Sequence, residues 1–200
     1  MKHLVIIAHP NPTSLSFAYV DQIVKTTEEN GHEVEVRNLY DIGFKATLDA
    51  TDFGAFQQGE SPEDIAKEQQ WIKWADTISF VYPIWWTGMP AILKGYFDRV
   101  FAYGFAYSVN EDGSYNQHLS DKKVLVFNNH GAPAEYYDSA GFHDAFLKTS
   151  DEGIFNFTGM EVLKHHFFGN VINGSDELRK GYIATVKDTI ERFFPATVEA

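Results

Sequence analysis

The most informative part of this chain is 77-TISFVYPIWWTGMPAILKGYFDRV-100. It opens with an apolar run, residues 77–82, which predicts a buried strand. It closes with a helical pattern over residues 91–100, and between the two lies a loop with two adjacent tryptophans. A strand that leads through an aromatic loop into a helix is how an open α/β sheet presents a flat cofactor at its carboxyl edge. This stretch is therefore the first indication of a flavin.

Apolar, strand-like runs alternate with helical patterns on both sides of this stretch. Strands separated by helices indicate a parallel sheet with right-handed crossovers. We expect an α/β fold with a doubly wound, five-stranded parallel sheet of order 2-1-3-4-5 and helices on both faces. We also expect a single domain over residues 1–194 and a frayed tail over 195–200. The predicted strands are 4–8, 33–39, 78–82, 124–127 and 162–168, and the first and last helices are 17–30, capped near Gly31, and 178–194.

Composition narrows the class of protein. With 44% hydrophobic and 22% charged residues among 200, the chain is neither disordered nor membrane-spanning. Its apolar runs are of strand length, far shorter than the roughly 18 residues of a transmembrane helix. It has no cysteine, which excludes disulfides and thiol nucleophiles, and we expect a cytoplasmic protein. The formal net charge of −12 argues against nucleic acid and anionic membranes as partners.

A second informative site is the turn after the first strand, 9-HPNPTSLSF-17, which gathers the hydroxyls of Thr13, Ser14 and Ser16 where a helix begins. A helix N-terminus offers free N–H groups and the positive end of a dipole, so this turn can bind phosphate without a lysine. Neither the G-x-x-x-x-G-K-[ST] loop nor the G-x-G-x-x-G fingerprint is present. Plain N-capping is the alternative for these hydroxyls. The aromatic loop after the third strand favours phosphate binding.

Four stretches together resemble the flavodoxin-like NAD(P)H:quinone oxidoreductases, the family of DT-diaphorase. These stretches are 8–17, 59–69, 83–100 with 104–107, and 128–131 with Tyr136 and His143. The resemblance implies a flavodoxin-like fold and hydride transfer from NADH or NADPH, through a bound flavin, to quinones or similar flat acceptors. It also implies a ping-pong mechanism and a homodimer with the active site at its interface. The stretch 59–69 is typical of the longer, FAD-binding members and favours FAD, with FMN as the other possibility.

The resemblance assigns roles to particular residues. Tyr136 and His143 match the pair proposed in the family to stabilise charge on the flavin during hydride transfer, and Tyr107 matches an aromatic residue that reaches the partner subunit. His130 stands where relatives carry glycine, which leaves the shape of the pocket open. The expected flavin-binding residues are His9, Thr13, Ser14, Ser16, Phe17, Pro83, Ile84, Trp85, Trp86, Asn128, Asn129, His130, Gly131 and Tyr136, and the expected acceptor pocket is Trp86, Tyr107, Tyr136 and His143.

Two other functions remain open from the sequence: a flavodoxin-type electron carrier, and a regulatory flavoprotein of a glutathione-gated potassium efflux system.

No metal site is expected, since the adjacent His165 and His166 lie on a predicted strand and point to opposite faces. Asp112-Gly113 predicts a hairpin turn.

Overall fold

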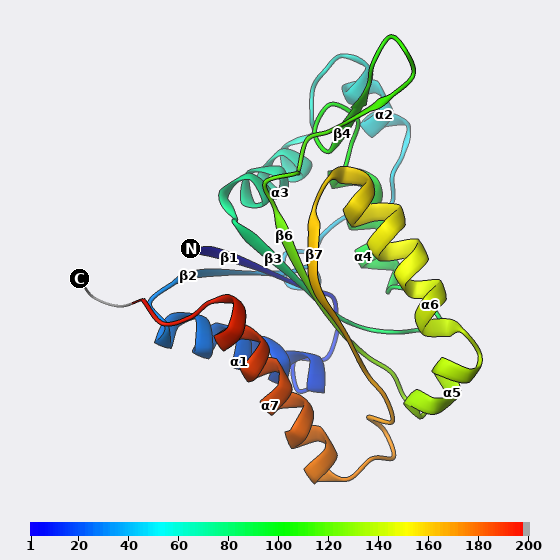
Figure 1. Ribbon diagram of the computed structural model, residues 1–200. Helices are drawn as coiled ribbons and strands as arrows, with labels where there is room; N and C mark the ends of the chain where they lie inside the picture. Colours follow the sequence, from blue (N-terminus) through cyan, green and yellow to red (C-terminus); the bar gives the residue numbers. More distant parts are fainter. Residues whose placement is uncertain (198–200) are drawn as a thin grey trace.

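Five strands form one parallel sheet in the computed structural model, which describes residues 1–197 (Figure 1). Their order is β2-β1-β3-β6-β7, which is the predicted order 2-1-3-4-5 when the strands of this sheet alone are counted. The central strands are buried on both faces, while β2 and β7 at the edges are half-exposed. The bounds are β1 (Lys2–Ile7), β2 (Glu33–Asn38), β3 (Thr77–Pro83), β6 (Lys123–Asn129) and β7 (Glu161–Phe168).

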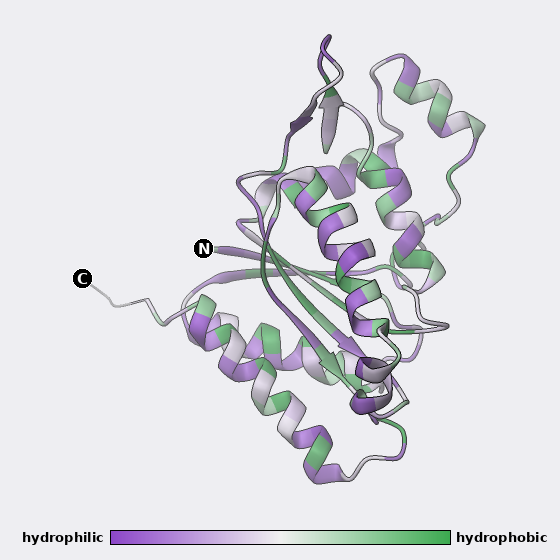
Figure 2. Ribbon diagram, turned by 45° about the vertical axis from the view of Figure 1, so that its right-hand side comes forward, coloured by the Kyte–Doolittle hydropathy of each residue, from purple (hydrophilic) through white to green (hydrophobic). Residues whose placement is uncertain are grey.

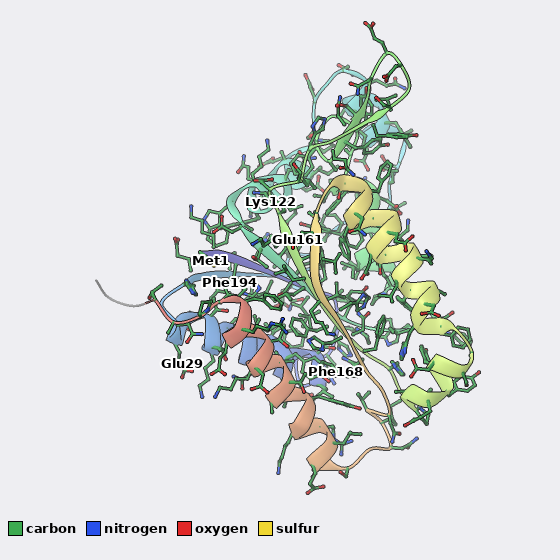
Figure 3. The ribbon with its side chains drawn as sticks, viewed as in Figure 1. Met1, Glu29, Lys122, Glu161, Phe168 and Phe194 are labelled. Atoms are coloured by element: carbon green, nitrogen blue, oxygen red, sulfur yellow. The ribbon has the colours of Figure 1, made fainter. Side chains whose placement is uncertain are left out.

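Helices cover both faces of the sheet and give two cores (Figure 1). On one face α1 and α7 pack side by side. The side chain of Phe168, at the end of β7, points toward these helices (Figure 3) and stacks on Tyr182 of α7. The other face is covered by α3, α4 and the segment from α5 to η2, whose apolar sides face the apolar strands (Figure 2). The bounds are α1 (Leu15–Glu29), α3 (Glu63–Trp74), α4 (Ala91–Val100), α5 (Ala134–Ser139), α6 (Phe142–Phe146), the π-helix η1 (Leu147–Phe155), the 3₁₀-helix η2 (Asn156–Thr158) and α7 (Asp176–Phe193).

Local chemistry explains where several elements begin and end. Gly31 has a φ of +79°, the left-handed conformation expected just after a helix, and α1 ends at Glu29. Helix α2 (Ala50–Gln57) was not predicted because its apolar pattern is weak, yet Asp49 and Asp52 form a capping box at its start. The buried Arg99 of α4 bonds Asp52 through Nε and Nη2, at 2.8 and 2.9 Å, and so fixes α2 beside α4.

A small hairpin stands away from the main sheet (Figure 1). Its strands, β4 (Tyr107–Val109) and β5 (Tyr115–Gln117), pair in antiparallel fashion. Gly113 at its turn has a φ of +83°, which confirms the predicted turn at Asp112-Gly113.

The end of the chain lies beside the turn after α1. His32 Nε2 bonds the carbonyl of Pro195 at 3.0 Å, and the amide of Thr197 donates to the carbonyl of Asn30, also at 3.0 Å. The first residues of the tail expected to fray are therefore tied to the domain, while 198–200 lie outside the described residues. Within residues 1–197, no helix has the length and apolarity needed to cross a bilayer.

Candidate active site

Loops at the carboxyl edge of the sheet enclose a pocket of about 340 Å³. This edge is where an open α/β sheet places its ligands, since the loops after parallel strands meet there. The pocket takes residues from the loops after β1, β3, β6 and β7. Its lining is His9, Ser14, Leu15, Ser16, Pro83, Ile84, Trp85, Asn129, His130, Gly131, Val171 and Ile172.

The turn after β1 forms one wall of this pocket and leaves a hydroxyl without a partner. Ser14 is the N-cap of α1, yet its side chain makes no capping bond, and its buried Oγ has no hydrogen-bond partner among residues 1–197. The first turn of α1 carries no acidic residue. Asn11 Oδ1 instead accepts from both the amide and the hydroxyl of Thr13, at 3.0 and 2.9 Å. An uncapped helix start with a buried, unpaired hydroxyl fits the phosphate of a flavin nucleotide.

His9 lies across this turn from the aromatic loop. Its Nδ1 accepts from the amide of Asn11 at 3.0 Å, and its ring lies 5.8 Å from the ring of Trp85. Partial burial lowers the pKa of His9, so the neutral ring is favoured near neutral pH.

The aromatic loop after β3 has a strained backbone. Trp85 and Gly88 exchange two backbone hydrogen bonds of 3.0 Å, which close a two-residue turn over Trp86 and Thr87. These two residues have φ values of +52° and +51°, a conformation that is costly for residues other than glycine. The Trp86 side chain is 100% exposed as a result. Strain of this kind is concentrated at functional sites, and here it holds a large aromatic ring out in solvent.

The last two residues of β6, Asn128 and Asn129, send their side chains to opposite faces of the sheet. Asn129 Nδ2 donates to Ser16 Oγ at 2.8 Å, so it joins the end of β6 to the turn after β1. Asn128 Nδ2 donates to the carbonyl of Tyr82, and Asn128 Oδ1 accepts from His165 Nε2 at 2.6 Å. The Asn129 side chain therefore lines the pocket, whereas the Asn128 side chain lies on the other face of the sheet and links β6 to β3 and β7.

Three residues of the expected acceptor pocket, Tyr107, Tyr136 and His143, do not line this pocket. Tyr136 is 56% exposed on α5 and does not line the pocket, whereas its neighbour Tyr137 is buried and stacks on His130 with ring centroids 3.9 Å apart. His143 bonds Asp138 Oδ1 through Nδ1 at 2.6 Å, and its Nε2 lies 3.2 Å from Nε2 of His130. Tyr107 lies on the hairpin, at a separate pocket of about 170 Å³ that Phe97, Phe101 and Phe157 also line.

Nine expected flavin-binding residues line the pocket, while Thr13, Phe17, Trp86, Asn128 and Tyr136 do not. Phe17 instead lines a groove between α1 and β2. Sequence reasoning missed Leu15, Val171 and Ile172. Val171 and Ile172 follow the fifth strand, and a loop at the same sheet edge was the signal that could have found them.

His165 and His166 point to opposite faces, as predicted: His165 Nδ1 lies 2.8 Å from Asp151 Oδ1, and His166 Nε2 lies 2.9 Å from the hydroxyl of Thr189. Within residues 1–197, no group of three or more histidine or carboxylate side chains is placed to hold a metal ion.

Comparisons with known proteins agree with this geometry. Residues 1–190 match the family model described as a flavodoxin-like fold. The chain is 38% identical over 184 residues to an uncharacterized NAD(P)H oxidoreductase of Haemophilus influenzae, covering 92% of this chain and 91% of that protein. It is 31% identical to the ribosyldihydronicotinamide dehydrogenase [quinone] of Rattus norvegicus, covering 92% and 88% of the two chains.

Among solved structures, the NAD(P)H:quinone oxidoreductase from Methanothermobacter marburgensis superposes with a TM-score of 0.88 at 26% identity, over 96% of this chain and 98% of that one. The fold, the pocket at its carboxyl edge and these relatives agree with the resemblance found in the motifs. The chain belongs to the flavodoxin-like NAD(P)H:quinone oxidoreductase family.

Proposed function

We propose that this protein is a flavin-dependent NAD(P)H:quinone oxidoreductase that transfers hydride, two electrons at a time, to quinones or similar flat aromatic acceptors. The observation that supports this most directly is the pocket of about 340 Å³, in which the turn after β1, the aromatic loop and the loop after β6 meet. The relatives named for NAD(P)H support this donor, and those named for quinones support this acceptor.

The residues around the pocket fit a flavin nucleotide. Ser14, with its unpaired Oγ, and the start of α1 would hold the phosphate, while Pro83, Ile84 and Trp85 would lie along the ring. The amides of Gly131 and Ala132 make no hydrogen bond within residues 1–197 and would donate to the rim of the ring. A bound flavin would supply the capacity to accept hydride from a nicotinamide and pass it on.

The protein's own contribution is position, electrostatics and exclusion of water. The exposed rings of Trp86 and Tyr136 would offer aromatic faces on which a flat acceptor could stack. Use of this one pocket by donor and acceptor in turn would give a ping-pong order, in which the oxidised nicotinamide leaves before the quinone enters. FAD is our preferred cofactor because of the stretch 59–69, and NADH and NADPH are both candidate donors.

Homodimerisation and a cytoplasmic location complete the proposal. Tyr103 and Tyr115 are exposed on either side of Tyr107, at 59% and 58%, so the hairpin surface could contribute to an interface. We expect light scattering to give the mass of a dimer, and a monomeric mass would contradict this part of the proposal.

A visible absorption spectrum of the purified protein tests the function. We expect a yellow protein, or one that becomes yellow with added FAD or FMN, that bleaches anaerobically with NADPH or NADH and regains colour with menadione. A protein that binds neither flavin would overturn the proposal. A yellow protein whose flavin is not reduced by NADH or NADPH, but which forms a stable semiquinone on partial reduction, would support the electron carrier instead.

The proposed roles of Tyr136 and His143 have their own test. Tyr136→Phe and His143→Gln should keep flavin bound but slow its reduction by NAD(P)H, by roughly tenfold or more each, because both remove a donor that stabilises developing charge. Stopped-flow absorbance measures this step directly, and unchanged rates in both variants would remove the two residues from the mechanism.

A further inference from the structure

Three polar side chains form a continuous hydrogen-bonded chain beside the pocket. Asp138 Oδ1 lies 2.6 Å from Nδ1 of His143, and Nε2 of His143 lies 3.2 Å from Nε2 of His130. The Asp138 side chain is 67% exposed and that of His143 is 13% exposed, while His130 is 2% exposed and lines the pocket. The chain therefore leads from solvent to the wall of the pocket.

Counting protons shows what this chain can hold. The carboxylate of Asp138 only accepts, so Nδ1 of His143 carries a proton. Only one proton fits between the two Nε2 atoms, because two N–H groups facing each other would repel. The neutral pair then has Nδ1 of His130 bare, and a third proton, which makes the pair a cation, can enter only at that nitrogen. The two rings therefore share one added proton.

Aromatic packing holds the two rings in this arrangement. Tyr137 stacks on His130 with centroids 3.9 Å apart, and Phe167 stacks on His143 with centroids 4.3 Å apart. Aromatic faces stabilise a cation placed over them. Nδ1 of His130 is buried and has no hydrogen-bond partner among residues 1–197.

The surroundings set how easily the added proton binds. Burial, followed by the charge of His143, lowers the pKa of His130, while the backbone of Ala132 and the carboxylate of Asp138 raise it. A new negative charge in the pocket would act in the same direction as Asp138. The other titratable groups nearby are Tyr136 and Tyr137 of α5, Asp144 of α6, His165 of β7 with Asp151 behind it, and His9 across the pocket.

We propose that His143 and His130 form one proton-holding unit for the reaction. Asp138 is the positioning residue that orients His143 within it, and His130 extends the unit to the wall of the pocket. This inference rests on the proposed function. Hydride from NAD(P)H brings two electrons and one negative charge into the pocket, and the pair binds one proton from solvent to balance that charge. When the hydride passes to a quinone, the proton leaves the pair as well. The quinone thus gains two electrons and two hydrogens and becomes a hydroquinone, and one solvent proton is consumed.

The first experiment measures the midpoint potential of the bound flavin as a function of pH. One extra proton taken up per two electrons steepens this dependence by about 30 mV per pH unit. We expect that steeper slope in the wild type, and its loss in His130→Gly, which restores the residue of the relatives, and in His130→Gln, which keeps a side chain if glycine loosens the loop. His166→Gln, on the opposite face of β7, is the matched control and should keep the wild-type slope.

The second experiment follows the histidine rings by ¹⁵N NMR in the full chain, with and without flavin. We expect His143 to carry its proton on Nδ1 at high pH, and His130 and His143 to share one titration midpoint. Asp138→Asn should lower that midpoint by about one pH unit, since it removes the negative charge but keeps an acceptor. Asp144→Asn is the control and should leave the midpoint within about 0.3 units, since within residues 1–197 Asp144 makes no hydrogen bond or ion pair with either ring.

The outcomes separate this inference from the proposed function. Equal slopes in the wild type and both His130 variants, all with flavin bound, would overturn the shared proton. Independent midpoints for the two histidines would also overturn it. If the wild type binds no flavin, the proposed function fails, and the NMR titration still decides whether the two rings act as a unit.

Discussion

At the scale of single residues, two serine N-caps differ in a way that separates binding from stability. Ser175 Oγ accepts from the amide of Leu178 at 3.2 Å and so caps α7. Ser14 occupies the same position on α1, but its buried Oγ has no partner within residues 1–197. An N-cap side chain that makes its hydrogen bond stabilises the fold. A buried hydroxyl without a partner does not, and it is available to bind a ligand instead.

We therefore expect opposite results from the same substitution at these two sites. Ser14→Ala should change the free energy of unfolding by less than about 0.5 kcal/mol but weaken flavin binding by roughly tenfold, because it removes a phosphate donor. Ser175→Ala should cost about 1 kcal/mol and leave flavin affinity unchanged. Urea denaturation and flavin titration measure the two quantities, and equal effects of both variants on affinity would contradict the assignment of Ser14.

At the scale of elements, α4 has to approach the loop that precedes α2 very closely. A Cβ built on Gly95 would lie 2.0 Å from the backbone oxygen of Ala46, so only glycine fits there. In the middle of α7, by contrast, a Cβ on Gly181 would meet nothing within 4 Å. Arg99, one turn further along α4, holds Asp52 and so fixes α2 on the same side. Close backbone packing thus places the helix that follows the aromatic loop.

Alanine should act in opposite directions at these two glycines. Gly181→Ala should stabilise the protein by about 0.5–1 kcal/mol, since alanine is the better helix former. Gly95→Ala should instead destabilise it by about 1–3 kcal/mol, because the backbones must move apart. Chemical denaturation tests both, and a stabilised Gly95→Ala variant would show that α4 does not need this close approach.

At the scale of the whole molecule, His3 joins several parts of one face of the sheet. Its ring bonds the hydroxyls of Thr27 on α1 and Ser79 on β3, at 3.1 and 2.7 Å, and stacks on Phe194 near the end of the chain. Met1 and Phe194 are close together in Figure 3, so this junction ties the two ends of the domain. Burial, followed by the charge of His32, lowers the pKa of His3 to about 3.

The lowered pKa of His3 makes stability depend on pH. Because the unfolded chain binds this proton near pH 6.5 and the folded one does not, the stability that His3 provides is present above pH 6.5 and lost as the pH falls toward 3. Between about pH 6.5 and 4.5 we expect a loss of roughly 2–3 kcal/mol that is absent in His3→Gln. Urea titrations at several pH values measure it. The exposed His118→Gln is the control, and a His3→Gln curve parallel to the wild type would contradict the prediction.

The fold was predictable because its signals are local and repeated. Buried parallel strands must be apolar along their length, as residues 78–82 are, and Asp112-Gly113 and Gly31 satisfy backbone requirements that few other residues meet. Helix α2 escaped prediction because its apolar pattern is weak, and its place in the fold depends on Asp52, which is paired with Arg99, a residue 47 positions away. A long-range ion pair leaves no periodic pattern in the sequence around it.

The site divides along the same line. The sheet order and three of the loops at its carboxyl edge could be predicted from the residue pattern, because strand order places those loops together. That Asn129 faces Ser16 while Asn128 faces His165 could be learned from the folded molecule alone, since a strand sends neighbouring side chains to opposite faces and packing determines which side each takes. The same is true of the contact of His130 with His143 and Tyr137, because that contact depends on how α5 and α6 pack over the edge of the sheet.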